Sequence, residues 1–296
     1  MRVVVSGGAG FIGTPLTNLL LKSGHEVLVI DTNSKQFEGK CSIAQVDVRS
    51  TEAIQALKNF GAESFIHLVA QKDVMTSVTN PLLDIDINVR ASVALFEAAI
   101  DSGVQSIVFA SSGGAIYSDQ APLPANENSE IKPKSPYGIS KLATEQYLHA
   151  MGIERQVRTI SMRMSNAFGP GDQVAGVIGK MSTLLLQNKS VTIYGDGSTT
   201  RDFIYVDDVA RAFAAALSSD FSGSVNISSN TQISLLDLYR EIAEIIGSEL
   251  KPVFQPARSG EIERSQLDNQ LAEKVLHWKP EISLQEGISR CIHAWR

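Results

Sequence analysis

The sequence predicts an α/β fold, with a parallel β-sheet covered by helices on both faces. Short apolar runs alternate with amphipathic stretches through the first half of the chain, which is typical of strand-helix-strand units. A glycine-rich turn joins the first apolar run to the first amphipathic stretch, and an acidic residue follows the second run. The length of 296 residues allows either one large α/β domain or two smaller ones.

Five apolar runs are predicted strands, and amphipathic helices lie between them. The strands cover residues 3–5, 26–30, 64–69, 106–110 and 159–163, and the helices cover residues 12–23, 51–60, 83–102 and 136–151. This order predicts a doubly wound sheet of the Rossmann type. Ligands of such sheets bind at the carboxyl ends of the strands.

The second half of the chain has a different pattern of predicted elements. Gly-, Pro- and Asp-rich connections separate short elements, and later helices are predicted at residues 206–217, 235–246 and 284–295. We therefore expect residues 1–165 to form a Rossmann domain, to which a strand near residues 224–227 returns. Residues 166–296 should form mainly a smaller lobe that supplies a second wall of the binding cleft.

Composition excludes several functional classes. The net charge of −6 gives no electrostatic basis for binding nucleic acid. No signal peptide and no apolar run of spanning length is present, so we expect neither secretion nor membrane insertion. Cys41 and Cys291 do not suggest a disulfide scaffold, and the five histidines lack metal-ligand spacing. A cytoplasmic protein without a metal is expected.

The glycine turn at residues 6–13 predicts a dinucleotide site. Gly7, Gly10 and Gly13 lie between a strand and a helix, where they permit a tight turn and close approach of a pyrophosphate to the helix N-terminus. Asp31 follows the second strand and can accept hydrogen bonds from a ribose, whereas it would repel a 2′-phosphate. The predicted cofactor is therefore NAD. Asp47 and Val48 could meet the adenine, although Asp47 could equally cap a helix.

Tyr137 and Lys141 are candidate acid-base residues. They are four positions apart on a predicted helix, so they share one face. A tyrosine titrates near 10, and its use as a base at pH 7 requires a pKa lower by about 3 units, or about 4 kcal/mol. The lysine charge would lower this pKa, and so would the helix dipole if Ser135 and Pro136 begin the helix. Such a pair also arises by chance, so the surrounding motifs must decide.

Several ordered motifs accompany this pair. They are the glycine turn, His67-Leu-Val-Ala-Gln-Lys72, Ser111-Ser112, Tyr137-Gly-Ile-Ser-Lys141, the segment from Arg163 to Pro170, and Gly195-Asp-Gly-Ser-Thr-Thr-Arg201-Asp-Phe-Ile-Tyr-Val-Asp-Asp-Val209. Over nearly its whole length the chain resembles extended short-chain dehydrogenases/reductases. Within them it is most similar to the nucleotide-sugar epimerase/dehydratase group, and in particular to UDP-glucose (UDP-galactose) 4-epimerases.

The resemblance implies roles for matching residues. Tyr137 would act as base and acid on the sugar 4-hydroxyl, and Lys141 would bind the nicotinamide ribose and lower the tyrosine pKa. The implied cofactor residues are Gly7, Gly10, Phe11, Ile12, Gly13, Asp31, Asp47, Val48, Leu68, Val69, Ala70, Lys72, Asn88, Tyr137 and Lys141. The implied substrate residues are Lys72, Ser112, Tyr137, Asn166, Val177, Ile193, Tyr194, Arg201, Arg258 and Ser265, with the two arginines clamping the diphosphate. Taken alone, Asn88 could equally be a helix residue that bonds a nearby loop.

Departures from the family pattern narrow the expected chemistry. Gly113 stands where the group carries a catalytic serine or threonine, so we expect Ser112, or failing that Ser111, to supply the hydroxyl. Gly114 and Ala115 stand where dehydratases and decarboxylases of the group carry acids, which disfavours both reactions. No arginine follows Gly169-Pro170, which favours a neutral sugar over a glucuronate. The small Ser265 leaves room for a 2-acetamido group.

These observations predict an NAD-dependent isomerase that epimerises a UDP-hexose at C4 through a transient 4-keto sugar. Two alternatives remain: a nucleotide-sugar oxidoreductase with net turnover of NAD(H), and a catalytically silent NAD-binding regulatory protein. A homodimer through the helices near residues 83–102 and 136–151 is expected from the family, although the apolar faces of these helices could equally be core. The product would enter carbohydrate metabolism or polysaccharide biosynthesis.

Overall fold

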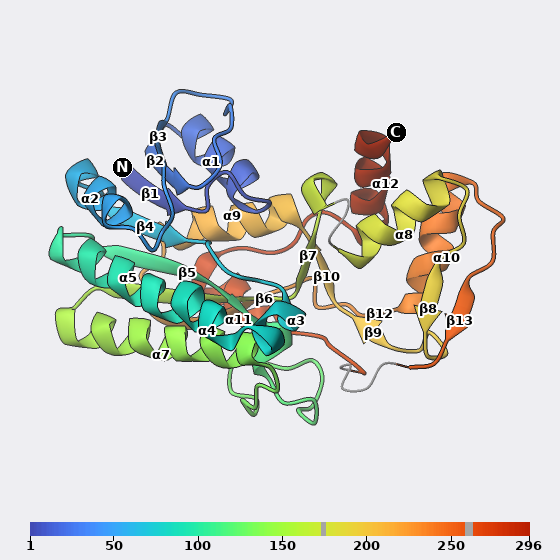
Figure 1. Ribbon diagram of the computed structural model, residues 1–296. Coiled ribbons are helices and arrows are strands. Elements are labelled where there is room, and N and C mark those ends of the chain that lie inside the picture. The colour runs from blue at the N-terminus through green and yellow to red at the C-terminus, as the bar shows by residue number, and fades with distance from the viewer. Residues whose placement is uncertain (173–175, 258–262) are drawn as a thin grey trace.

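A seven-stranded parallel sheet forms the centre of the computed structural model, which describes residues 1–172, 176–257 and 263–296 (Figure 1). The strand order is β11-β6-β5-β4-β1-β2-β3. The strands are β1 (Arg2–Ser6), β2 (Glu26–Asp31), β3 (Ser42–Gln45), β4 (Ser64–His67), β5 (Ser106–Ser112), β6 (Arg158–Met164) and β11 (Gly223–Ile227). The predicted α/β class with a doubly wound parallel sheet is confirmed.

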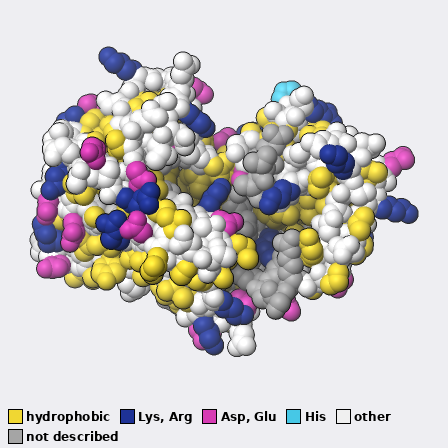
Figure 2. Space-filling view, in the orientation of Figure 1, with side chains coloured by type: hydrophobic (Ala, Val, Ile, Leu, Met, Phe, Trp, Pro, Cys, Tyr) yellow, Lys and Arg dark blue, Asp and Glu magenta, His cyan; other side chains and the backbone are white. Residues whose placement is uncertain are grey.

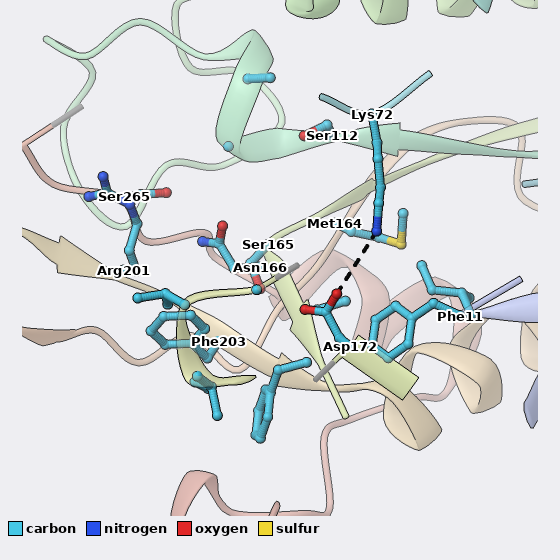
Figure 3. Close-up of a pocket in the computed structure, with 18 of the residues that line it drawn as sticks. Phe11, Lys72, Ser112, Met164, Ser165, Asn166, Asp172, Arg201, Phe203 and Ser265 are labelled. Carbon is cyan, nitrogen blue, oxygen red and sulfur yellow. Dashed lines mark ion pairs between the residues drawn. The ribbon is translucent and has the colours of Figure 1, made fainter. Parts of the chain in front are cut away.

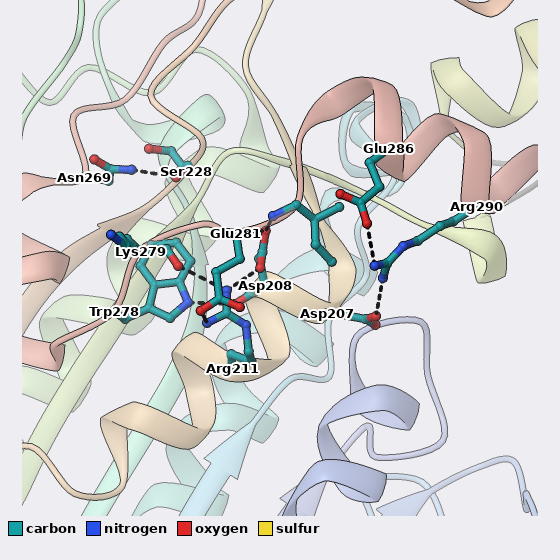
Figure 4. Close-up of polar contacts among 11 residues, drawn as sticks. Asp207, Asp208, Arg211, Ser228, Asn269, Trp278, Lys279, Glu281, Glu286 and Arg290 are labelled. Atoms are coloured by element: carbon teal, nitrogen blue, oxygen red, sulfur yellow. Dashed lines mark hydrogen bonds and ion pairs between the residues drawn. The ribbon is translucent and has the colours of Figure 1, made fainter. Parts of the chain in front are cut away.

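Helices cover both faces of this sheet, because successive strand residues point to opposite sides. Val3 and Val5 pack with α1 (Gly13–Lys22), α9 (Val206–Ala216) and α11 (Gln270–Leu276), whereas Val4 packs with α2 (Thr51–Phe60), α5 (Ser92–Asp101) and α7 (Pro136–Arg155). A polar link anchors the chain beyond α11. Buried Asp208 of α9 accepts hydrogen bonds from the backbone N–H groups of Glu281 (3.2 Å) and Ile282 (3.0 Å) (Figure 4).

Three elements differ from the sequence-based prediction. The edge strand β3 was not predicted, since its short, mostly exposed run has no apolar pattern. Strand β4 ends at His67 rather than at residue 69. The helix expected over residues 83–102 is divided into α4 (Pro81–Ile85), a π-helix (Asp86–Ala91) and α5. Single π-turns inside helices are often found at functional sites.

In its described residues, the second lobe consists of three helices and three pairs of short strands. The helices are α8 (Val177–Leu186), α10 (Leu235–Ile246) and α12 (Leu284–Trp295). The pairs are β7 (Asn166–Phe168) with β10 (Phe203–Tyr205), β9 (Thr200–Arg201) with β12 (Ile233–Ser234), and β8 (Thr192–Tyr194) with β13 (Val253–Gln255). Shorter elements are α3 (Val74–Thr79), α6 (Gly113–Ile116) and the 3₁₀ turn η2 (Pro170–Asp172). Within the described ranges, no helix has the length and apolarity needed to cross a membrane.

Candidate active site

Two cavities meet at the carboxyl ends of the central strands. The first, of about 450 Å³, lies over β1, β2 and β4, and we call it the dinucleotide cavity. The second, of about 510 Å³, lies between the sheet and the second lobe, and we call it the sugar cavity. Figure 2 shows the hollow between these two parts of the molecule. Phe11, Ile12 and Lys72 line both cavities, so ligands in the two would touch the same side chains.

The glycine turn forms the floor of the dinucleotide cavity. Gly7 has a φ of +77°, which a residue with a side chain rarely adopts. A Cβ on Gly13 would lie 2.0 Å from the carbonyl oxygen of Gly7, so no side chain fits at this position. The backbone can therefore approach a ligand closely at the start of α1.

Asp31 is held at the edge of the same cavity. One carboxylate oxygen accepts a hydrogen bond from the Ala9 N–H (3.0 Å), and the other accepts one from the Asn33 N–H (2.9 Å). The side chain is fixed by these bonds and still lines the cavity. This geometry suits recognition of a ribose by a carboxylate at the end of β2.

Most predicted cofactor residues line the dinucleotide cavity. They are Gly7, Gly10, Phe11, Ile12, Gly13, Asp31, Asp47, Val48, Leu68, Val69, Ala70 and Lys72. Asp47 does not cap α2, because Ser50 does. A hydrogen bond from Arg49 lowers the pKa of Asp47 to about 2. Sequence reasoning missed Thr32, Val46, Gln71 and Ile87, which also line this cavity.

Asn88 lies behind this wall rather than in it. Its side-chain oxygen accepts a hydrogen bond from the Gln71 N–H (2.8 Å), and its amide nitrogen donates to the Gln71 carbonyl (2.9 Å). Asn88 is 1% exposed and does not line the cavity. Asn88 thus has the contacts of a helix residue that bonds a nearby loop, which is the alternative given for it above.

Lys141 is buried against β5. Helix α7 begins as predicted, with Ser135 as its N-cap and Pro136 in its first turn. The Lys141 ammonium donates a hydrogen bond to the Ala110 carbonyl (2.8 Å) and lies 5.9 Å from the centre of the Tyr137 ring. Burial lowers the pKa of Lys141 to about 8, although the charges of Glu145 and Asp84 act in the opposite direction.

Tyr137 lines the sugar cavity, but its pKa differs from the expectation. Burial raises the pKa of the phenol to about 12, a hydrogen bond with Ser112 opposes this rise, and the charge of Asp84 adds to it. The expected lowering by Lys141 is therefore wrong for this structure. The physical reason is that the ammonium is directed to the Ala110 carbonyl, while desolvation of the phenolate dominates.

The hydroxyl beside Tyr137 belongs to Ser112. Ser112 ends β5 and lines the sugar cavity with Tyr137, and its hydroxyl opposes the rise of the Tyr137 pKa. Ser111 also lines the sugar cavity, but it is 1% exposed, and its hydroxyl has no hydrogen-bond partner within the described chain. Gly113 is buried, and a side chain there would meet Leu267 rather than the cavity. Of the two candidate serines, the geometry favours Ser112.

Several predicted substrate residues gather around the sugar cavity (Figure 3). Lys72, Ser112, Tyr137, Asn166, Val177, Arg201 and Ser265 line it. Ile193 does not, because it is 1% exposed in the core of the second lobe, and its neighbour Tyr194 is also absent from the lining. Arg258 lies outside the described residues.

Asp172 is a lining residue that sequence reasoning missed. Its carboxylate lies 3.9 Å from the Lys72 ammonium, and the two side chains extend toward each other from opposite walls (Figure 3). Burial raises the pKa of Asp172, while the charges of Lys72 and Lys180 oppose this. Its only signal in the sequence is an acid directly after the Gly169-Pro170-Gly171 turn. Met164, Ser165 and Phe203 were also missed.

Comparison with known proteins identifies the family. A profile of the NAD-dependent epimerase/dehydratase family matches residues 3–228. The chain belongs to this family. The UDP-glucose 4-epimerase of Mycolicibacterium smegmatis is 35% identical, with 100% of this chain and 99% of that protein covered.

Solved structures of the family share the fold over the whole chain. The UDP-glucose 4-epimerase of Thermotoga maritima, solved with UDP-glucose, is 33% identical with a TM-score of 0.95, and 100% of this chain and 99% of that one are covered. The Thermus thermophilus UDP-glucose 4-epimerase, solved with NAD, is 35% identical with a TM-score of 0.90 at the same coverage. NAD is the cofactor of this family, and the glycine turn and Asp31, where the sequence predicts its binding, line the dinucleotide cavity.

Proposed function

We propose that this protein interconverts UDP-hexoses that differ in configuration at C4, through a transient 4-keto sugar. The observation that supports this most directly is that Tyr137 and Ser112 both line the sugar cavity, with the Lys141 ammonium 5.9 Å from the centre of the Tyr137 ring. A phenol that removes and returns the proton of a sugar hydroxyl, beside a second hydroxyl that holds the same oxygen, is what reversible oxidation at that carbon requires.

The side chains divide the proton chemistry between them. NAD, when bound, would supply a hydride acceptor and donor. Tyr137 would take the proton of the 4-hydroxyl and later return it, while Ser112 would hold the same oxygen in place. The Lys141 ammonium is buried and lies 5.9 Å from the centre of the Tyr137 ring, so its role would be to hold the nicotinamide ribose, as the family resemblance implies, rather than to lower the pKa of Tyr137.

The second lobe would hold the nucleotide. Arg201 lines the sugar cavity, and a guanidinium suits a diphosphate because its forked donors match the phosphate oxygens. Asn166 lies at the same wall on β7. We therefore assign the diphosphate to residues 166–296, which form mainly a substrate lobe. The hexose can then turn about its diphosphate linkage and present either face to Tyr137.

Two lining residues favour particular sugars. Asp172 places a carboxylate in the cavity wall, which would repel a uronate and so favours a neutral hexose. Ser265 is a small residue in the same wall, and a Cβ on Gly114 would meet nothing nearer than the Ser265 hydroxyl at 4.0 Å. This space supports acceptance of UDP-N-acetylhexosamines.

The test is direct conversion of substrate. Incubation with UDP-glucose, UDP-galactose and their 2-acetamido counterparts should yield the 4-epimers by NMR, with no accumulation of NADH absorbance. Tyr137→Phe should fold and bind NAD as the parent does but lose turnover by at least about a hundredfold. Stoichiometric change in NADH would indicate an oxidoreductase instead. Bound NAD with no conversion of any of the four sugars would reject the proposal.

We also propose that the protein forms a homodimer. Large apolar side chains are exposed on three adjoining helices, where Figure 2 shows hydrophobic atoms over α4 and α7. They are Val74, Met75 and Val78 of α3, Leu82 and Ile85 of α4, and Ile139, Tyr147 and Ile153 of α7. Such a continuous apolar face supports an isologous contact with a second copy.

Light scattering tests this interface. Ile153 is 77% exposed, so Ile153→Asp should leave the fold intact and shift a dimer to a monomer. Phe254 of the second lobe, 48% exposed, offers the matched control, and Phe254→Asp should leave the mass unchanged. A monomeric mass for the parent protein at micromolar concentration would reject the dimer.

A further inference from the structure

Asp84 of α4 is a buried carboxylate that joins three separate segments. It is fully buried, yet three polar side chains direct donors at it. Ser140 of α7 donates at 2.5 Å, Asn88 of the π-helix at 2.9 Å, and Gln71 of the loop after β4 at 3.1 Å. Each donor is uncharged, so the carboxylate is satisfied by hydrogen bonds alone.

The first of these bonds reaches the helix that carries the proposed acid-base pair. Ser140 precedes Lys141 and follows Tyr137 by three positions on α7. One turn further on, Thr144 donates to the carbonyl oxygen of Asn88 (2.7 Å). Two successive turns of α7 are therefore bonded to the α4/π-helix segment.

The other two bonds reach the wall of the dinucleotide cavity. Gln71 lines this cavity, and its side chain donates to Asp84 while its backbone is bonded on both sides by Asn88. Asp84 and Asn88 thus hold the loop that continues into Lys72, which lines both cavities. The loop and α7 are bonded to the same carboxylate.

We propose that Asp84 is a positioning residue that fixes the catalytic helix α7 against the cofactor-binding loop at Gln71. The proposal rests on the function proposed above, since it concerns the relative placement of Tyr137 and the dinucleotide. Misplacement of reacting groups by about 1 Å can cost a hundredfold in rate, which gives a reason for burying a polar cluster here.

The charge of Asp84 acts on the same pair. It raises the pKa of both Tyr137 and Lys141. The other groups that face Lys141 are Glu145, whose charge also raises the lysine pKa, and His67, whose pKa burial lowers to about 3 so that it is uncharged at neutral pH. Tyr137 faces Ser112 as well. The charge of Asp84 therefore favours the protonated forms of both Lys141 and Tyr137.

Titration of Tyr137 tests this role without depending on turnover. Asp84→Asn retains the shape of the side chain and an acceptor oxygen but removes the charge. In protein labelled with ¹³C at the tyrosine Cζ, with the Tyr137 signal assigned by Tyr137→Phe, we expect the Tyr137 pKa to fall in Asp84→Asn. Asp86→Asn is the matched control, because Asp86 pairs with Arg49 and Arg90 on the exposed side of the π-helix. It should leave the titration unchanged.

An unchanged Tyr137 titration in folded Asp84→Asn would overturn the proposal. If this variant does not fold, Ser140→Ala provides the second test, since it removes one bond to Asp84 and lines neither cavity. We expect its kcat to fall about tenfold with the KM for UDP-glucose unchanged. A parental kcat in Ser140→Ala would likewise overturn the proposal. The parent could interconvert no sugar while Asp84→Asn still shifts the Tyr137 titration. The proposed function would then be rejected, but the proposed effect of Asp84 on Tyr137 would stand.

Discussion

Leu267 occupies the space that a side chain at Gly113 would need. A Cβ on Gly113 would lie 2.4 Å from one Leu267 methyl carbon and 3.1 Å from the other. Leu267 is itself 2% exposed, and its backbone is bonded to both Asp202 and Ser228. The space at Gly113 is thus filled by a leucine that is far away in the sequence, and we propose Ser112 as the source of the hydroxyl in the site.

Gly113→Ser should therefore destabilise the protein without improving the enzyme. Displacing the buried Leu267 side chain should cost about 1–3 kcal/mol in the free energy of unfolding, measured with urea. Gly114→Ser is the control, because its Cβ would have 4.0 Å of clearance, and it should lose much less stability. A severalfold rise in kcat for Gly113→Ser would show that a hydroxyl at 113 can reach the sugar after all.

The two neighbouring serines should differ in their effect on turnover. Ser112→Ala removes the hydrogen-bond partner of Tyr137, so we expect kcat to fall by about 10 to 100-fold. Ser111→Ala removes a buried hydroxyl without a partner in the described chain, so kcat should stay within about twofold of the parent and stability should not decrease. Steady-state kinetics on UDP-glucose would separate the two. Equal losses would contradict the assignment of Ser112.

The dinucleotide cavity was predicted well because backbone geometry dominates it. Parallel strands end at one edge of the sheet, so the order of strands and the glycine spacing are enough to bring Gly7, Gly13 and Asp31 together. The sugar cavity was predicted less completely, since its second wall comes from irregular segments. Asp172 and Lys72 are brought together only by tertiary packing, so no local sequence pattern predicts their ion pair.

Other differences between the structure and the expectation also have physical causes. Ile193 lies on β8, which pairs with β13. In this pair the side chain of Ile193 points into the core of the second lobe. The π-helix at Asp86–Ala91 keeps the apolar spacing of an ordinary helix, so periodicity could not reveal it. The pKa of Tyr137 depends on burial and on Asp84, neither of which a motif five residues long contains.

Lys141 should make stability and activity respond to pH in opposite directions. Its pKa is about 8 in the folded protein and near 10.5 unfolded, so between these values the unfolded state binds more protons. The parent should therefore gain up to about 3 kcal/mol relative to Lys141→Met as pH rises through this window. Turnover should fall over the same range as the ammonium is lost. If the difference in unfolding free energy between the two proteins were the same at all pH values, the lowered pKa of Lys141 would be rejected.

Asp172 should control the choice between neutral and acidic sugars. Its carboxylate lines the sugar cavity and is 9% exposed, so its field on a bound sugar is weakly screened. Asp172→Asn keeps the volume and removes the charge, and we expect the ratio of kcat/KM for UDP-glucuronate to that for UDP-glucose to rise about tenfold.

The control for this change is Asp119→Asn, which removes a carboxylate whose ion pair with Lys134 lies outside the sugar cavity. It should leave the ratio unchanged. Because Lys72 would lose its partner in Asp172→Asn, NAD affinity should be measured alongside, and a change of the sugar ratio with constant NAD affinity assigns the effect to the sugar. An unchanged ratio would mean that the sugar carboxylate does not approach this wall, and that the preference for neutral sugars must be sought elsewhere in the cavity.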